Sequence, residues 1–313
     1  MFGKISLRNI PMHVFQALES MANSHDRSTE AEARQAIHAW VEPVLVKEER
    51  SARRQEVAVR LSRLLQLVNA DRYGDKLRPS HVAQEIKEER ATEAEDWFLG
   101  NIEPTFSQLE AIANSFGINV KWLQHGDGNI YPVQNYRLSE DPEQAVQWLG
   151  TWDPDNPEGD TVKTLHLIRS MSEQGELYIV KESTRGHFRV YYTPTHVSEK
   201  IGAGGEAQLK YLFVTLELLY KHWSKALVKY QVIGHLLEPT DITLLIRGQS
   251  NPGALLRDHG VSMWWEDIWD RKMVERHNYW PGWRSLCDRI ERALQASGHL
   301  AELREKIRSG ALL

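Results

Sequence analysis

Residues 4–11 have the sequence Lys-Ile-Ser-Leu-Arg-Asn-Ile-Pro, in which polar and apolar side chains alternate. A period of two is typical of a β-strand with one face toward solvent and one toward a core. The polar face carries Lys4, Ser6 and Arg8, and the apolar face carries Ile5 and Leu7. We therefore predict a short amphipathic strand at this position.

Two helical patterns follow the predicted strand. Apolar residues recur at positions 14, 18 and 21, which predicts an amphipathic helix from about 11 to 23. Ser28 or Thr29 can cap a second helix, with Glu30 and Glu32 favourable in its first turn. The apolar face of this second helix is formed by Ala33, Ile37, Trp40 and Val41. Pro43 is expected to end it.

A lone strand with two helices can neither pair its own backbone nor cover both helix faces. A homodimer solves both problems by pairing two strands and packing four helices into one core. Residues 1–43 resemble the Arc/MetJ-type ribbon-helix-helix family, in its antitoxin-like branch. The resemblance rests on residues 4–11, Ala-Leu at 17–18 and Arg-Ser-Thr-Glu-Ala-Glu at 27–32.

That resemblance implies a DNA-binding and dimerisation domain whose paired ribbon enters the major groove. Lys4, Ser6 and Arg8 are the expected base-reading residues, since arginine suits guanine and serine suits either partner type. The backbone N–H groups at Ser28 and Thr29 are expected to hold a phosphate. The competing interpretation is that the polar strand face is merely solvated.

Residues 44–56 form a charge-dense connector that can extend the second helix, and residues 57–133 read as short helices with tight turns. The middle segment resembles the lambda-repressor/Cro-type helix-turn-helix fold. The matching features are Trp97 to Gly100, Pro104, Phe116-Gly117-Ile118, Val120 to Leu123 and Gly126. In that family the first residues of the 80–86 helix touch phosphate and the 92–99 helix lies in the major groove. The implied contacts are Ser80, His81, Arg90, Thr92 and Glu93.

The helix expected in the groove departs from the family pattern. It carries Glu93, Glu95 and Asp96 and no lysine or arginine. These carboxylates would repel a polyanion, although glutamate or aspartate can accept a hydrogen bond from cytosine. A helical module retained for packing or protein contacts is therefore an equally weighted interpretation.

Residues 134–313 mix strand and helix patterns, with residues 134–160 expected to be a linker and 161–313 an α+β domain. A hairpin is predicted from the β-prone runs 176–181 and 187–192. A helix is predicted at about 205–223, and further β-prone runs cover 226–236 and 241–247. Helices return at 283–294 and 300–307. We expect helices around a small, mainly antiparallel sheet that binds a ligand or partner, or sets the oligomeric state.

No catalytic or metal site is predicted in this segment. Its histidines lack metal-ligand spacing, and the single cysteine, Cys287, lies on an apolar helix face. The Gly-Ala-Gly-Gly stretch at 202–205 lacks the Lys-Ser/Thr of a phosphate loop, so a turn before a helix is favoured. The tryptophans at 264, 265, 269, 280 and 283 are more often core than a ligand cage.

The distribution of net charge limits how the protein can bind nucleic acid. The chain has 313 residues and a net charge of −5, and no segment is net basic: 1–56 is neutral, 57–133 carries −3 and 134–313 carries −2. Bulk charge therefore cannot drive nucleic-acid binding, and placed groups must do so. We expect these groups to be chiefly Lys4 and Arg8, with Arg50, Arg53 and Arg54 as additional candidates.

Together these patterns predict a multidomain, non-enzymatic, sequence-specific DNA-binding regulator, with a repressor as the favoured form. We expect a cytoplasmic homodimer or higher homo-oligomer without cofactor or membrane span. Its DNA site is expected to have two-fold symmetry, and an effector, small molecule or protein, is expected at the C-terminal domain. The alternative is an antitoxin-like adaptor whose C-terminal domain binds and controls a protein partner.

Overall fold

A five-stranded mixed sheet organises the C-terminal part of the computed structural model, which describes residues 5–72, 74–153 and 159–312. The strand order is β1-β4-β3-β2-β5; β3 is antiparallel to β2 and β4, whereas β1 and β5 run parallel to their neighbours. The strands are β1 (Val133–Asn135), β2 (Val162–Ser170), β3 (Glu176–Ser183), β4 (Phe188–His196) and β5 (Gln231–Leu237). The sheet is thus mixed rather than mainly antiparallel.

The predicted hairpin is confirmed as β3 and β4, but the predicted strand at 241–247 is wrong. That segment is helix α9 (Pro239–Ile246). Pro239 occupies the first helical position, where its missing N–H has no partner to lose, and Asp241 lies in the first turn near the positive end of the helix dipole. These start signals outweigh the β-propensity of the apolar run.

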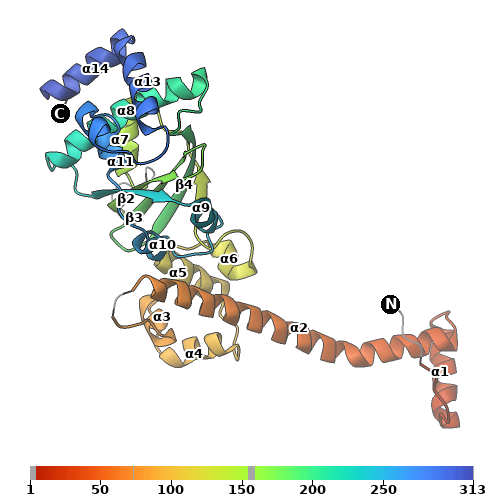
Figure 1. The fold of residues 1–313 in the computed structure, drawn as a ribbon. Helices are drawn as coiled ribbons and strands as arrows, with labels where there is room; N and C mark the ends of the chain where they lie inside the picture. Colours follow the sequence, from red (N-terminus) through yellow and green to blue (C-terminus); the bar gives the residue numbers. More distant parts are fainter. Residues whose placement is uncertain (1–4, 73, 154–158, 313) are drawn as a thin grey trace.

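One face of the sheet is covered by α7 (Pro142–Gly150), α8 (Ala203–Ser224) and the C-terminal helices (Figure 1). The C-terminal helices are α11 (Trp264–Asp267), α12 (Arg271–Arg276), α13 (Trp283–Gln295) and α14 (Gly298–Ser309). In the hydrophobic core on this face, Leu165, Ile179 and Tyr191 of the sheet are buried against these helices. Residues 142–150, within the segment expected to be a linker, form α7 and bury Val146 and Leu149 in this core.

The opposite face of the sheet packs on α9, α10 (Pro252–Asp258) and the helices of the middle segment. Those helices are α3 (Pro79–Glu85), α4 (Ala91–Leu99), α5 (Phe106–Phe116) and α6 (Val120–His125), together with the end of α2. Leu61 of α2 and Ile112 of α5 belong to the same buried cluster as Ile168 and Val190 of the sheet. The middle helices and the sheet therefore share one hydrophobic core.

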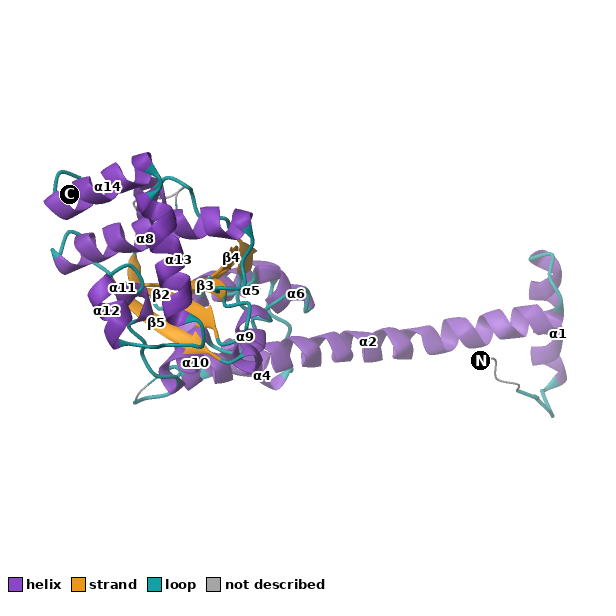
Figure 2. Cartoon of the chain, turned by 45° about the horizontal axis from the view of Figure 1, so that its top comes forward, coloured by secondary structure: helices purple, strands orange, loops and turns teal. Residues whose placement is uncertain are grey.

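Helix α2 (Thr29–Ala70) extends from this body to the N-terminal segment, where α1 (Met12–Ser24) lies against its far end (Figure 2). The expectation that Pro43 ends the helix is wrong, because α2 continues through it. Proline removes one helical hydrogen bond, at a cost of about 3 kcal/mol in a helix interior. Helical turns on both sides of the proline propagate the structure across that one lost bond.

Candidate nucleic-acid interface

The N-terminal segment places its expected reading residues on an exposed surface. The predicted strand is absent from the single chain, where residues 5–10 belong to no helix or strand and Pro11 precedes α1. Ser6 and Arg8 are exposed, and Arg8 makes no hydrogen bond or ion pair with the described residues. Lys4, the third expected reader, lies outside the described residues.

The apolar side of the same segment is uncovered. Ile5 is 70% exposed and Leu7 is 58% exposed, and α1 exposes further large apolar side chains: Met12, Val14, Phe15 and Met21. On α2, Trp40 is 82% exposed. Within residues 5–42 only Ala22 and Glu32 are buried. A segment that buries so little cannot hold its fold alone, which is the situation that a second copy would relieve.

A buried carboxylate fixes the turn between α1 and α2. Glu32 accepts hydrogen bonds from His25 Nδ1 at 3.0 Å and lies 2.9 Å from Arg27 Nε. Both partners lie in the turn that follows α1. The start of α2 is therefore held in a defined position relative to α1.

The expected phosphate position lies at the start of α2. Ser28 is the N-cap, and its Oγ accepts a hydrogen bond from Ala31 N at 3.2 Å. Thr29 is the first helical residue and is partly exposed. The capping prediction for Ser28 is confirmed, whereas phosphate binding at Ser28 and Thr29 stays a prediction.

The five contacts expected on the middle segment fall on α3 and α4, which pack on each other. Thr92 and Glu93 are exposed in the first turn of α4, and Arg90 is its exposed N-cap. Ser80 is partly exposed on α3, and the Nδ1 atom of His81 accepts a hydrogen bond from the backbone of Arg78 at 2.9 Å. The structure brings these residues onto two adjacent short helices. Neither Ser80 nor Thr92 is the N-cap of its helix, because α3 begins at Pro79 and α4 at Ala91.

The exposed surface of α4 is acidic at its start and apolar beyond its end. Glu93 and Glu95 are exposed, while Leu99, Ile102 and Phe106 are 65%, 46% and 55% exposed. Carboxylates repel phosphate, and exposed apolar side chains are typical of protein contacts.

Two of the three arginines expected to help DNA binding, Arg53 and Arg54, bond to other parts of the protein, whereas the side chain of Arg50 lies outside the described residues. Arg53 donates to Glu103 at 2.6 Å, and Arg54 donates to the backbone oxygen of Asn101 at 2.9 Å. Both bonds tie α2 to the loop after α4. These two side chains are therefore structural rather than free for DNA.

The interpretations of the C-terminal aromatics and cysteine as core are confirmed. Trp264, Trp265, Trp280 and Trp283 are buried, and burial raises the pKa of the Cys287 thiol well above its usual value. No cluster of three or more histidine, cysteine or acidic side chains suited to a metal occurs in residues 5–72, 74–153 and 159–312. No helix among them is long and apolar enough to span a membrane.

Sequence reasoning missed three buried basic side chains in the sheet, a histidine pair and a lysine. His166 Nδ1 and His235 Nε2 lie 3.1 Å apart on adjacent parallel strands, and burial lowers their pKa values to about 3 and about 4. Burial lowers the pKa of Lys181 to about 7; its Nζ donates to the backbone oxygen of Thr151 at 2.8 Å. Strand pairing creates the histidine pair, and the packing of the C-terminal end of α7 on the sheet creates the Lys181 site, so no local spacing in the sequence signals either of them.

Comparison with known proteins identifies only the N-terminal segment. Residues 4–41 match the family model described as antitoxin FitA-like, ribbon-helix-helix. No curated protein and no solved structure matches the chain. The N-terminal segment is thus a ribbon-helix-helix domain of the FitA-like antitoxin type, and the remaining residues are defined by their structure alone.

Proposed function

We propose that this protein is a sequence-specific DNA-binding regulator that reads the major groove through a homodimeric N-terminal ribbon. The observation that carries the proposal is the family match at residues 4–41 together with the uncovered apolar face of the same residues. Domains of this kind bind DNA as dimers. A second copy would cover Ile5 and Leu7 and supply the strand partner that residues 5–10 lack in the single chain.

In the dimer, Lys4, Ser6 and Arg8 of both copies would face the base edges. Arg8 suits a bidentate contact with guanine. The start of α2, at Ser28 and Thr29, would fix the register on a phosphate. Two-fold pairing of the ribbon requires a DNA site of two-fold symmetry. Repression is the favoured outcome, since occupying a promoter needs no activation surface, and the proposal assigns no catalytic activity.

The middle helices are proposed to form a helix-turn-helix fold whose exposed surface serves protein contacts. The acidic start of α4 and the exposed Leu99, Ile102 and Phe106 support protein contact over DNA contact. A Thr92→Ala/Glu93→Ala variant separates the two readings. Loss of oligomerisation or partner binding with unchanged DNA affinity supports protein contact, whereas weaker DNA binding contradicts it.

The central test compares Arg8→Ala with Arg271→Ala, an exposed arginine on α12 far along the chain. DNA fragments bound by the wild-type protein are first selected from genomic DNA and sequenced. On the enriched site, Arg8→Ala should lose about 1–3 kcal/mol of binding free energy and relax the preference at one base position in each half-site. Arg271→Ala should bind like the wild type.

Two results contradict the proposal. The first is genomic selection that enriches no discrete site. The second is an Arg8→Ala variant with unchanged affinity and base preference, which removes the ribbon from DNA recognition.

An antitoxin-like adaptor is the second candidate, and the description of the matching family favours it. In this case the C-terminal domain would bind and control a protein partner. A partner that co-purifies in fixed stoichiometry, and that stays bound after residues 1–28 are deleted, would support it. A protein recovered alone under the same conditions argues against it.

A further inference from the structure

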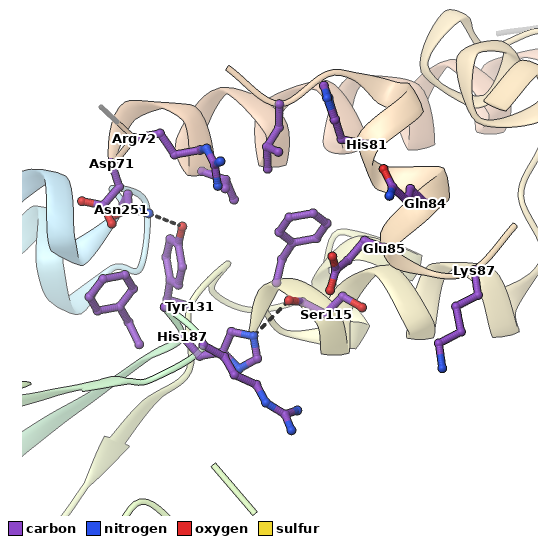
Figure 3. Close-up of a pocket in the computed structure, with 16 residues that line it drawn as sticks. Asp71, Arg72, His81, Gln84, Glu85, Lys87, Ser115, Tyr131, His187 and Asn251 are labelled. Carbon is purple, nitrogen blue, oxygen red and sulfur yellow. Dashed lines mark hydrogen bonds between the residues drawn. The ribbon is translucent and has the colours of Figure 1, made fainter. Parts of the chain in front are cut away.

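A cavity of about 600 Å³ lies where the middle helices meet the sheet (Figure 3). Its walls come from the end of α2, from α3, from the end of α5 and from the turn between β3 and β4. Its size falls within the range of small-molecule sites, roughly 300–1,000 Å³. A ligand here would touch elements that are more than 100 residues apart in the sequence.

The inner wall is aromatic and includes a tyrosine hydroxyl that is held in place by a hydrogen bond. Tyr131 is 2% exposed and lines the cavity together with Phe116 and Phe188. The Tyr131 hydroxyl accepts a hydrogen bond from Asn251 Nδ2 at 3.1 Å, and Asn251 Oδ1 in turn accepts one from Ala254 N at 3.0 Å. These two linked hydrogen bonds fix the Asn251 side-chain amide as the donor to Tyr131, so the phenolic hydrogen of Tyr131 is left for an acceptor in the cavity. Burial raises the pKa of Tyr131 to about 12, so the hydroxyl keeps its proton at neutral pH.

The rim of the cavity is cationic. Arg72, Lys87 and Arg185 are exposed around it, and no carboxylate of the described residues pairs with them. Figure 3 shows the Arg72 side chain on the same side of the cavity as Tyr131. Its one hydrogen bond to the described chain is from Nε to Asp75 O at 3.4 Å.

Two acidic groups also line the cavity, and they do not cancel this charge. Asp71 is bound to Arg257 at 2.6 Å, and Arg257 lies outside the lining. Glu85 is the remaining carboxylate. His81 adds a donor, because its Nδ1 accepts from the Arg78 backbone and the neutral ring therefore carries its proton on Nε2. Three cations face one uncompensated carboxylate, so the cavity favours a negative ligand.

We propose that this cavity binds a small organic anion, with an aromatic body against Phe116 and a carboxylate or phosphate between Arg72 and the Tyr131 hydroxyl. The anion would bridge the α2–α3 corner to the β3–β4 turn. The regulatory part of this inference rests on the proposed function: the anion would act as an effector of DNA binding.

The test uses the full-length protein and three probes: 4-phenylbutyrate, phenyl phosphate and the neutral 4-phenylbutan-1-ol. Binding is measured without DNA by ligand-observed NMR titration. At least one anionic probe should bind at least tenfold more tightly than the alcohol. Arg72→Gln and Tyr131→Phe should each weaken that binding about tenfold, since a charge-assisted or buried hydrogen bond is lost.

Arg137→Gln, at a separate exposed cavity that contains Arg137, Lys200 and Gly202, is the matched control and should bind like the wild type. Arg72 is exposed, so Arg72→Gln remains informative if Tyr131→Phe lowers stability. Equal binding of alcohol and anions, no binding of either anion, or unchanged binding in Arg72→Gln overturns the proposal.

The same experiment separates this inference from the DNA-binding proposal. Arg8→Ala should bind the anionic probe normally even when it no longer reads DNA. A saturating probe should change the affinity of the wild type for its selected DNA site at least threefold, and this change should disappear in Arg72→Gln. Probe binding without any change in DNA affinity overturns the effector role.

Discussion

Leu7→Ala tests whether the uncovered face of the N-terminal segment is a dimer interface. Burying a fully exposed leucine side chain contributes about 1.5–3 kcal/mol. Leu7 is 58% exposed in the single chain, so the exposed portion accounts for roughly 0.9–1.7 kcal/mol in each copy. Two copies lose roughly 1.8–3.4 kcal/mol per dimer, which corresponds to a dissociation constant raised roughly 20- to 300-fold.

The assay is sedimentation of the labelled full-length protein across a dilution series. Ser6→Ala is the matched control, because residue 6 lies on the opposite face of the same alternating stretch. It should leave the dimer unchanged while weakening DNA binding. An unchanged dimer in Leu7→Ala, or equal weakening in Ser6→Ala, would refute the assignment of the two faces.

Three further predictions concern the body of the protein. Glu217→Gln should lower the free energy of unfolding, measured in urea, by about 3 kcal/mol, because two arginines lose the buried carboxylate that they share. The control Glu305→Gln, at an exposed position, should change it by less than about 0.5 kcal/mol. The folded state lowers the pKa of Lys181, so above pH 7 the unfolded chain binds more protons than the folded chain, and the free energy of unfolding rises with pH. Lys181→Met should remove about 2 kcal/mol of this rise between pH 7 and pH 9 in urea titrations. An unchanged pH slope contradicts the assignment of Lys181 as a buried amine. Gly117→Ala should lower the stability more than Gly186→Ala by at least about 1 kcal/mol in thermal unfolding. Both glycines have positive φ, but only a Cβ at residue 117 would lie 2.6 Å from a histidine ring. Equal losses would show that the ring moves away without cost.

The sequence allowed the N-terminal domain to be predicted because its signals are local. Alternation over seven residues and the Ser28 cap act within one or two turns of chain. Pro43 misled for the same reason: its local preference was outweighed by the helical residues on both sides. The direction of Leu7 toward a second copy is inferred from the pattern together with its exposure.

The candidate cavity could not be predicted, because its walls meet only in the folded chain. Arg72 follows α2, Tyr131 precedes β1 and Asn251 caps α10, and no spacing between them carries a signal. The core shared by the middle helices and the sheet could not be predicted for the same reason. The apolar side chains at positions such as Ile112 and Val190 predict burial, but the sequence does not predict which element covers them.

The unbroken course of α2 through Pro43 fixes a rotational phase between the N-terminal segment and the rest of the molecule. An α-helix turns by about 100° per residue, so one inserted residue near position 50 would rotate the body by that angle and advance it by about 1.5 Å. Seven inserted residues add nearly two whole turns and restore the phase while lengthening the helix by about 10 Å. At about 3.4 Å per base pair, that step equals about three base pairs of DNA. Under the proposed DNA binding, any partner or second site that the body must meet on the same DNA is therefore selected by helical phase as well as by distance.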